Sequence, residues 1–242
     1  MARFDSVLMT DRTLWYSPML FLNASNDQHG NLDYVFDTFD SMPAGVPWRV
    51  AITPRFRHHI AAAEGNNLLL WMETWLKGSA VWPREQLLSL WPPTPVAALL
   101  VGADDGIPRV QLEAAASDAN ANEIERVVVY YNIGQAEPKA RHWREVSHPH
   151  LILTQSSSSS PNPHPNLSQV EPPLVGPAEG RVIDDELWGP GWRARRWTVQ
   201  LPTIDPALHM VSFVNVHYKN GIVLTAPLVE GVPSEIRSVI LT

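Results

Sequence analysis

Two apolar segments near the start of the chain, separated by one amphipathic stretch, limit how the first third can fold. Residues 17–27 and 48–53 have the length and composition of buried strands. Between them, apolar residues recur at helical spacing from Leu32 to Met42, and the prolines within 43–47 end that helix. Strand, helix and strand in this order form a βαβ unit with parallel strands. We therefore predict an α/β fold for the beginning of the chain.

A proline-rich break at residues 91–95 separates this region from one of different character. Beyond it, short apolar segments follow one another with turn residues between them, which is typical of an immunoglobulin-like or fibronectin-like β-sandwich. The strands predicted in this part are 109–117, 123–133, 141–147, 192–201, 208–219, 222–226 and 238–242. We predict two domains, an α/β part over 1–95 and an all-β sandwich over 105–242.

Local signals add detail to both parts. A helix is expected from an N-cap at Asn66 or Asn67 to a stop at Gly78. Residues 218–222 contain Asn-Gly, which favours a tight hairpin turn. Residues 148–185 are rich in Ser, Pro and His, and we expect them to be a disordered excursion between strands.

Composition excludes several classes of function. The 242 residues contain no cysteine, so disulfides, zinc–thiolate sites and cysteine catalysis are excluded. The net charge of −7 argues against nucleic acid or an anionic membrane as a partner. No segment approaches the ~20 apolar residues of a membrane span, and the first residues do not resemble a signal peptide. We expect a soluble protein without a cofactor, and the composition leaves its compartment open.

Each of the two predicted N-terminal strands is followed by a side chain with catalytic potential. Asp27 follows the first strand and His58 the second, one βαβ step later. The carboxyl ends of neighbouring parallel strands lie at one edge of a sheet, where open α/β sheets bind ligands. An acid followed by a histidine also matches the last two members of the order Ser…Asp…His. In such a site the histidine takes the serine proton, and the acid orients and stabilises the imidazole.

Other interpretations of these residues remain open. Alone, an aspartate after a strand is more often a loop cap, and a lone histidine is more often a surface or core residue. His59 is a rival for the general base, and His29 is a weaker candidate. A metal site formed by His29, His58 and His59 has the spacing of no standard ligand motif, so no metal is predicted. The acids of the intervening helix are expected on its solvated face: Asp33, Asp37 and Asp40.

The nucleophile of such a triad is missing from the sequence. No serine has glycine at both the −2 and +2 positions, so there is no Gly-x-Ser-x-Gly elbow. A His-Gly-Gly-Gly oxyanion loop, a Walker loop and a dinucleotide fingerprint are also absent from the sequence. Ser25 lies on the same strand end as Asp27 and cannot take the place of an elbow serine.

Several short motifs resemble one group of hydrolases. In the N-terminal part they are Pro18–Asp27, the Pro54-x-x-x-His58 element and Trp75–Gly78. With these motifs, residues 17–91 resemble the C-terminal third of secreted bacterial α/β-hydrolases of the acetyl xylan esterase and dienelactone hydrolase type. They also resemble the PhoPQ-activated pathogenicity-related proteins. Residues 109–226 resemble the β-sandwich appended to some of these enzymes, with cues at 128–131, 141–144, 197–202 and 213–218.

This resemblance implies the C-terminal portion of a serine ester hydrolase, with Asp27 as the triad acid and His58, favoured over His59, as the base. It implies a small ester or acylated carbohydrate as substrate, and members of the group are often secreted or periplasmic. The missing nucleophile predicts that the chain alone is inactive and associates with an N-terminal hydrolase half or with itself. The alternative is a non-catalytic β-sandwich that binds a glycan or a protein, for which the ten tryptophans offer stacking surfaces.

Overall fold

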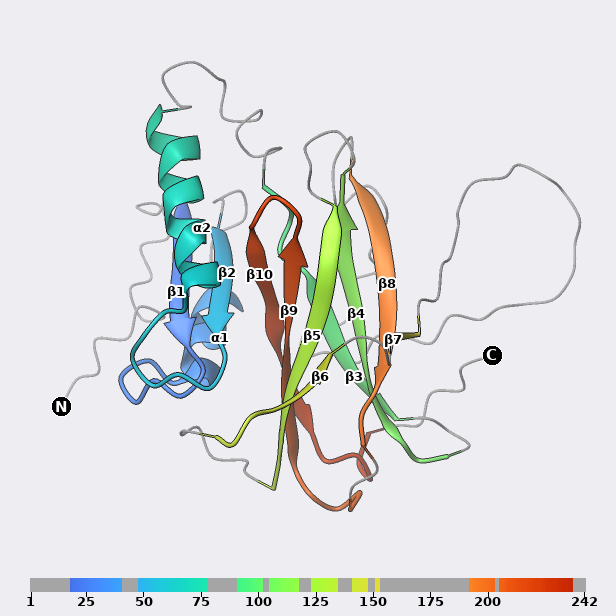
Figure 1. Ribbon diagram of the computed structural model, residues 1–242. Coiled ribbons are helices and arrows are strands. Elements are labelled where there is room, and N and C mark those ends of the chain that lie inside the picture. The colour runs from blue at the N-terminus through green and yellow to red at the C-terminus, as the bar shows by residue number, and fades with distance from the viewer. Residues whose placement is uncertain are drawn as a thin grey trace, which may run out of the picture.

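Two antiparallel four-stranded sheets form most of the structure, which is a computed structural model (Figure 1). The residues that it describes are 18–40, 48–77, 91–101, 105–117, 123–134, 141–147, 151–152, 192–202 and 205–236. One sheet has the order β10-β9-β5-β6, formed by Val223–Gly231, Met210–Tyr218, Ile124–Ile133 and Arg144–Ser147. The other has the order β3-β4-β8-β7, formed by Val96–Val101, Pro108–Ala116, Arg193–Gln200 and Leu151–Ile152.

The main core lies between these two sheets. Val127 and Val129 of β5 and Val214 and Val216 of β9 point into it, and Leu112 of β4 meets them from the other sheet. All five side chains are buried. Alternate residues of β5 and β9 point to the opposite face, as the period of two in a strand requires.

The opposite face of the β9 sheet is also covered. There, Val128 and Phe213 pack against Val50 and Ile52 of β2 and against Phe36 of α1. Strand β9 is therefore buried along its whole length. Burial on both faces explains why its sequence, Met-Val-Ser-Phe-Val-Asn-Val-His-Tyr, is a nearly continuous apolar run and not an alternating one.

The layer that covers this face is formed by the N-terminal elements. They are β1 (Met19–Ala24), α1 (Leu32–Asp40), β2 (Trp48–Thr53) and α2 (Ala62–Met72), which continues as the π-helical turn η3 (Glu73–Lys77). Strands β1 and β2 pair in parallel, in a register that runs from Met19 opposite Trp48 to Ala24 opposite Thr53. Figure 1 shows this pair with its two helices beside β10.

The prediction of an α/β fold is wrong, because the described elements are mostly strands of the two antiparallel sheets. The expected βαβ unit is present, but among the described residues no further parallel strand extends it. Two parallel strands cannot bury their own apolar faces, and the outer face of the β9 sheet covers β2 instead. In the described part of the chain, the βαβ unit therefore forms an outer layer on a β-sandwich.

The proposed division into residues 1–95 and 105–242 stays a prediction. Trp71 and Trp91 from the first segment pack into the main core with residues of the second. Strand β3 lies at 96–101, where no strand was predicted. Most of the expected excursion at 148–185 and the strand expected at 238–242 lie outside the described residues. Within 148–185, residues 151–152 form β7.

The predicted hairpin turn connects β9 and β10. The Tyr218 N–H donates to the Ile222 carbonyl at 2.8 Å, and the Gly221 N–H donates to the Tyr218 carbonyl at 2.9 Å. Gly221 has a φ of +87°, which L-residues with a side chain rarely adopt. Asn220, the other residue of the Asn-Gly pair, does not have a positive φ, so Gly221 alone supplies it in this turn.

Candidate active site

The ends of β1 and β2 are tied together, and this connection places the loops that carry the predicted catalytic residues. The Ser25 N–H donates to the Thr53 carbonyl at 2.9 Å, which continues the parallel ladder by one step. The Asn26 N–H then donates to the Phe56 carbonyl, also at 2.9 Å. Residues 25–27 and 53–58 therefore leave the sheet side by side.

Asp27 and His58 form a direct hydrogen bond in this position. The distance from Asp27 Oδ2 to His58 Nδ1 is 2.8 Å. The Asp27 side chain is only 11% exposed, whereas that of His58 is 71% exposed. An ionised carboxylate can only accept a hydrogen bond, so Nδ1 is the donor, and in the neutral ring Nε2 then carries the lone pair. This is the tautomer that a general base needs to take a proton at Nε2.

The second oxygen of Asp27 is also bonded. Oδ1 accepts the backbone N–H of His29 at 2.8 Å. Burial by itself raises the pKa of Asp27, but the hydrogen bonds from the His29 backbone and the His58 side chain outweigh it. The pKa of this carboxyl group therefore lies below its ordinary value of 3.8, and the group is ionised at neutral pH.

Replacing Asp27 with asparagine is expected to destabilise the protein in a pH-dependent way. A pKa lowered by folding stabilises the folded state above the unfolded value of 3.8, and this contribution is lost as the pH falls through the folded pKa. The difference in unfolding free energy between wild type and Asp27→Asn should thus be constant near neutral pH and shrink below 3.8. Urea unfolding across this range measures it, and a difference that persists unchanged in acid would contradict the expectation.

Arg55 holds the loop at residues 53–58 against the loop at residues 25–27. Its backbone has a φ of 67°, in the left-handed region that disfavours residues other than glycine. Its N–H donates to Ser25 Oγ at 2.7 Å, and its side chain donates from Nε to the Trp143 carbonyl at 3.2 Å. Non-glycine residues in this conformation persist where the surroundings fix them, and they cluster at functional sites.

Ser25 thus has a structural role. It is 4% exposed, and its hydroxyl is the acceptor for the strained Arg55 backbone. We expect Ser25→Ala to lower the free energy of unfolding by about 1–2 kcal/mol, because the Arg55 N–H loses its partner. Urea unfolding measures the loss, with Ser234→Ala at an exposed serine as the matched control. Equal stability of wild type and Ser25→Ala would contradict this role.

A second set of contacts fixes the Asp27 loop to the sandwich. Asn26 Oδ1 accepts the Arg141 backbone N–H and the Trp143 Nε1–H, each at 2.9 Å. The Arg141 side chain, 1% exposed, forms a bidentate ion pair with Asp33, with both N–O distances at 2.9 Å. The expectation that Asp33 lies on a solvated helix face is therefore wrong. Nothing in the sequence indicated that Asn26 and Arg141, which lie 115 positions apart, would be in contact.

The loop that carries His58 is closed by the start of α2. The Ala61 N–H donates to Thr53 Oγ1 at 3.1 Å, so a threonine at the end of β2 holds the residue that immediately precedes this helix. The Thr53 hydroxyl also bonds the buried Glu64 carboxyl group. The helix begins at Ala62 with Ala61 as its N-cap, so the prediction of an N-cap at Asn66 or Asn67 is wrong.

The other histidine candidates take different positions. The ring of His29 lies edge-on to that of His58, with the centroids 5.5 Å apart. His59 is exposed, and no hydrogen bond or ion pair joins it to a described residue. The described residues contain no group of three His, Cys, Asp or Glu side chains that could hold a metal ion. The geometry therefore brings together Asp27 and His58, with His29 beside them.

Exposed tryptophans do not occur among the described residues. Seven of the ten lie there: Trp48, Trp71, Trp75, Trp91, Trp143, Trp192 and Trp197. Each is buried or half-buried, and several belong to the core clusters. This part of the chain offers no exposed indole platform for stacking on a sugar.

Comparison with known proteins adds no family assignment. No model of a known protein family matches the chain, and a search of curated proteins finds no significant match. In the part of the chain that the structure describes, none of the helices has the length and apolar character needed to cross a membrane.

Proposed function

We propose that this chain carries the acid and the general base of a serine ester hydrolase site, and that a nucleophile from outside these 242 residues completes it. The observation that supports this most strongly is the 2.8 Å hydrogen bond from His58 Nδ1 to Asp27 Oδ2. It joins two side chains that follow neighbouring parallel strands. It leaves Nε2 as the basic atom on a side chain that is 71% exposed.

The nucleophile is assigned to another polypeptide segment for two reasons. The sequence lacks a Gly-x-Ser-x-Gly elbow. In addition, Ser25, two residues before Asp27, is buried and its hydroxyl accepts the Arg55 backbone N–H. A general base at the surface can serve a serine that approaches from outside the chain, provided that the serine comes within hydrogen-bond distance of Nε2. The substrate class that we propose is a small ester or an acylated carbohydrate.

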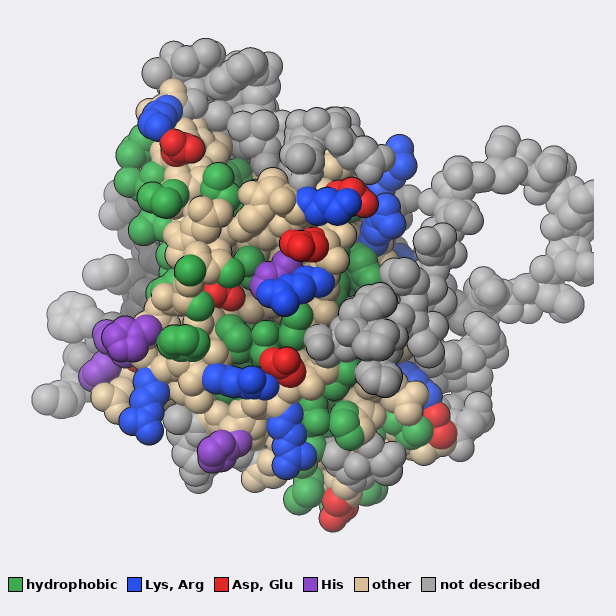
Figure 2. Space-filling view, viewed as in Figure 1, with side chains coloured by type: hydrophobic (Ala, Val, Ile, Leu, Met, Phe, Trp, Pro, Cys, Tyr) green, Lys and Arg blue, Asp and Glu red, His purple; other side chains and the backbone are tan. Residues whose placement is uncertain are grey.

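An apolar surface stripe supports association with such a segment. Four side chains on α2 and η3 are exposed: Leu68, Leu69, Met72 and Leu76, at 48%, 65%, 45% and 65%. Figure 2 shows apolar side chains at the surface along α2 and histidine side chains on the same side of the molecule. Contiguous apolar surface of this kind commonly marks a protein interface.

The proposal is tested by the reading frame that precedes this one. We expect it to encode a Gly-x-Ser-x-Gly segment, and we expect its product, purified with this chain, to hydrolyse p-nitrophenyl acetate. In that complex His58→Gln and Asp27→Asn should each lower kcat by about 10⁴-fold, by analogy with the loss of triad members elsewhere. His59→Gln is the matched control and should leave kcat unchanged.

Two outcomes would contradict the proposal. One is an upstream frame without a hydrolase-like elbow. The other is a complex whose kcat is the same in wild type and in His58→Gln. The chain by itself should show no labelling by a fluorophosphonate probe, because its sequence contains no Gly-x-Ser-x-Gly elbow.

A further inference from the structure

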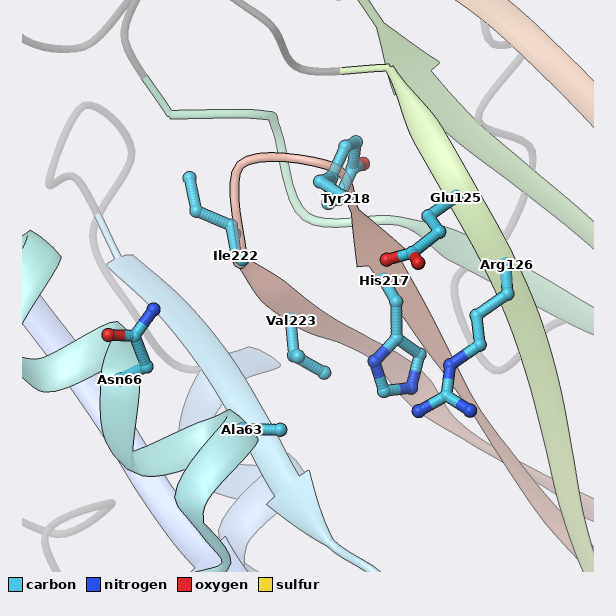
Figure 3. A pocket seen from close by; sticks show the side chains of 9 residues that line it. Ala63, Asn66, Glu125, Arg126, His217, Tyr218, Ile222 and Val223 are labelled. Carbon is cyan, nitrogen blue, oxygen red and sulfur yellow. The ribbon is translucent and has the colours of Figure 1, made fainter.

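A cavity of about 330 Å³ lies between the first turns of α2 and the β9–β10 hairpin (Figure 3). Its polar wall contains Glu125, Arg126 and His217, and its apolar wall contains Ile222 and Val223. Neither Asp27 nor His58 lines it. An inference about this cavity is therefore independent of the function proposed above.

A β-bulge places two opposite charges at this cavity. In the pairing of β5 with β9, Ile124 lies opposite Tyr218 and Arg126 opposite His217, so Glu125 is the extra residue. Neighbouring residues of a regular strand point to opposite faces, but a bulge can turn both toward the same side. Both Glu125 and Arg126 line the cavity, and both are exposed. Bulges are enriched next to functional sites, where they redirect a side chain.

These two charges are not used elsewhere in the described structure. No ion pair or hydrogen bond joins the side chain of Glu125 or Arg126 to another described residue, although Arg126 exerts a longer-range effect on the pKa of Glu64 and His217. They are also not paired with each other. The polar wall of the cavity therefore carries one cation and one anion that can both bind a ligand. A ligand with one negative and one positive charge would complement them.

His217 contributes an unpartnered polar atom to the same wall. The residue is only 8% exposed, and its buried Nε2 has no hydrogen-bond partner among the described residues. Burial, assisted by the Arg126 charge, lowers the pKa of His217 to about 4, so the ring is neutral at pH 7. A neutral imidazole still has one N–H donor. A buried polar group without a partner is unfavourable, and a bound acceptor would supply the missing hydrogen bond.

We propose that this cavity binds a small amphipathic zwitterion of the α-amino acid type. Its carboxylate lies between Arg126 and His217, and its ammonium group faces Glu125. Its apolar side chain packs on Ile222 and Val223. Figure 3 shows the His217 ring beside the Arg126 guanidinium, with Val223 and Ile222 on the neighbouring strand and turn. A carboxylate in that position would accept hydrogen bonds from a guanidinium and an imidazole together.

Three matched probes test the proposal by isothermal titration calorimetry on the purified chain. They are L-leucine, 4-methylpentanoate, which lacks its amino group, and 3-methylbutylamine, which lacks its carboxylate. Leucine is expected to bind, and each truncated probe should bind at least tenfold more weakly. Absence of leucine binding at millimolar concentration would overturn the proposal. Equal affinity for leucine and either truncated probe would overturn the assignment to a zwitterion.

Substitutions then test the residues. Arg126→Gln and Glu125→Gln should each weaken leucine binding at least tenfold without changing the melting temperature, because both side chains are exposed. Arg144→Gln is the matched control, since this exposed arginine of β6 does not line the cavity, and it should leave the affinity unchanged. Unaltered leucine affinity in Arg126→Gln would overturn the proposed site.

Discussion

Replacing Asn215 with alanine is expected to lower the free energy of unfolding by about 3 kcal/mol. Asn215 Nδ2 donates to the Ile52 carbonyl at 2.9 Å, and its Oδ1 accepts the Thr225 hydroxyl at 2.7 Å. The Thr225 hydroxyl oxygen in turn accepts the Ile52 N–H at 2.8 Å. All three residues are fully buried, so alanine would leave the Ile52 carbonyl without its donor and the Thr225 O–H without its acceptor.

This closed network joins β2 to the sandwich, and its loss should also disturb the loop that follows β2. Urea unfolding followed by tryptophan fluorescence measures the change in stability. Asn66→Ala is the matched control, because that side chain forms no hydrogen bond with a described residue and lies in a helix, where alanine is favoured. A loss below about 1 kcal/mol for Asn215→Ala would contradict the importance of this network.

Replacing Asp33 with alanine is the second large effect, with an expected loss of about 3 kcal/mol. Its bidentate partner Arg141 has a side chain that is 1% exposed, so removal of Asp33 takes a carboxylate partner away from a buried charge. Breaking such a pair costs more than the pair itself contributes. The substitution should also loosen Asn26, which accepts the Arg141 backbone N–H next to Asp27.

Urea unfolding measures this loss as well. The matched control is Glu73→Ala, which removes the carboxylate of the exposed Glu73–Lys77 pair, whose side chains are 60% and 76% exposed. That substitution should leave the stability unchanged, because solvent screens exposed pairs. Equal losses in Asp33→Ala and Glu73→Ala would contradict the distinction between the buried and the exposed ion pair.

Local patterns in the sequence were sufficient to predict several elements. The strand at 48–53 and the hairpin at 218–222 follow from apolar runs and a glycine turn. The start of α2 was misplaced because its N-cap, Ala61, carries no capping side chain, and the hydroxyl that holds Ala61 belongs to Thr53, before the His58 loop. Strand β3 was missed because Val-Ala-Ala-Leu-Leu-Val has no alternation and follows a run of prolines.

The fold class could not be predicted from these elements, because it depends on which surface covers the βαβ unit. Asn215 and Thr225, which bond the β2 backbone, have the appearance of ordinary strand residues in the sequence. The continuous apolar run of β9 was the available signal, since it indicates a strand buried on both faces. The pair of Asp27 and His58 was predictable because it depends only on strand order and strand ends. The residues that hold the pair were not.

The hydrogen bond between Asp27 and His58 is tested most directly by ¹⁵N NMR of the histidine side chains at about pH 8.5, where a free imidazole is neutral. The geometry predicts that His58 carries its proton on Nδ1 and that Asp27→Ala changes the His58 ring nitrogen shifts. His59 serves as the internal control and should not respond. A His58 ring protonated on Nε2, with shifts that are the same in wild type and in Asp27→Ala, would contradict an acid–base pair at this site.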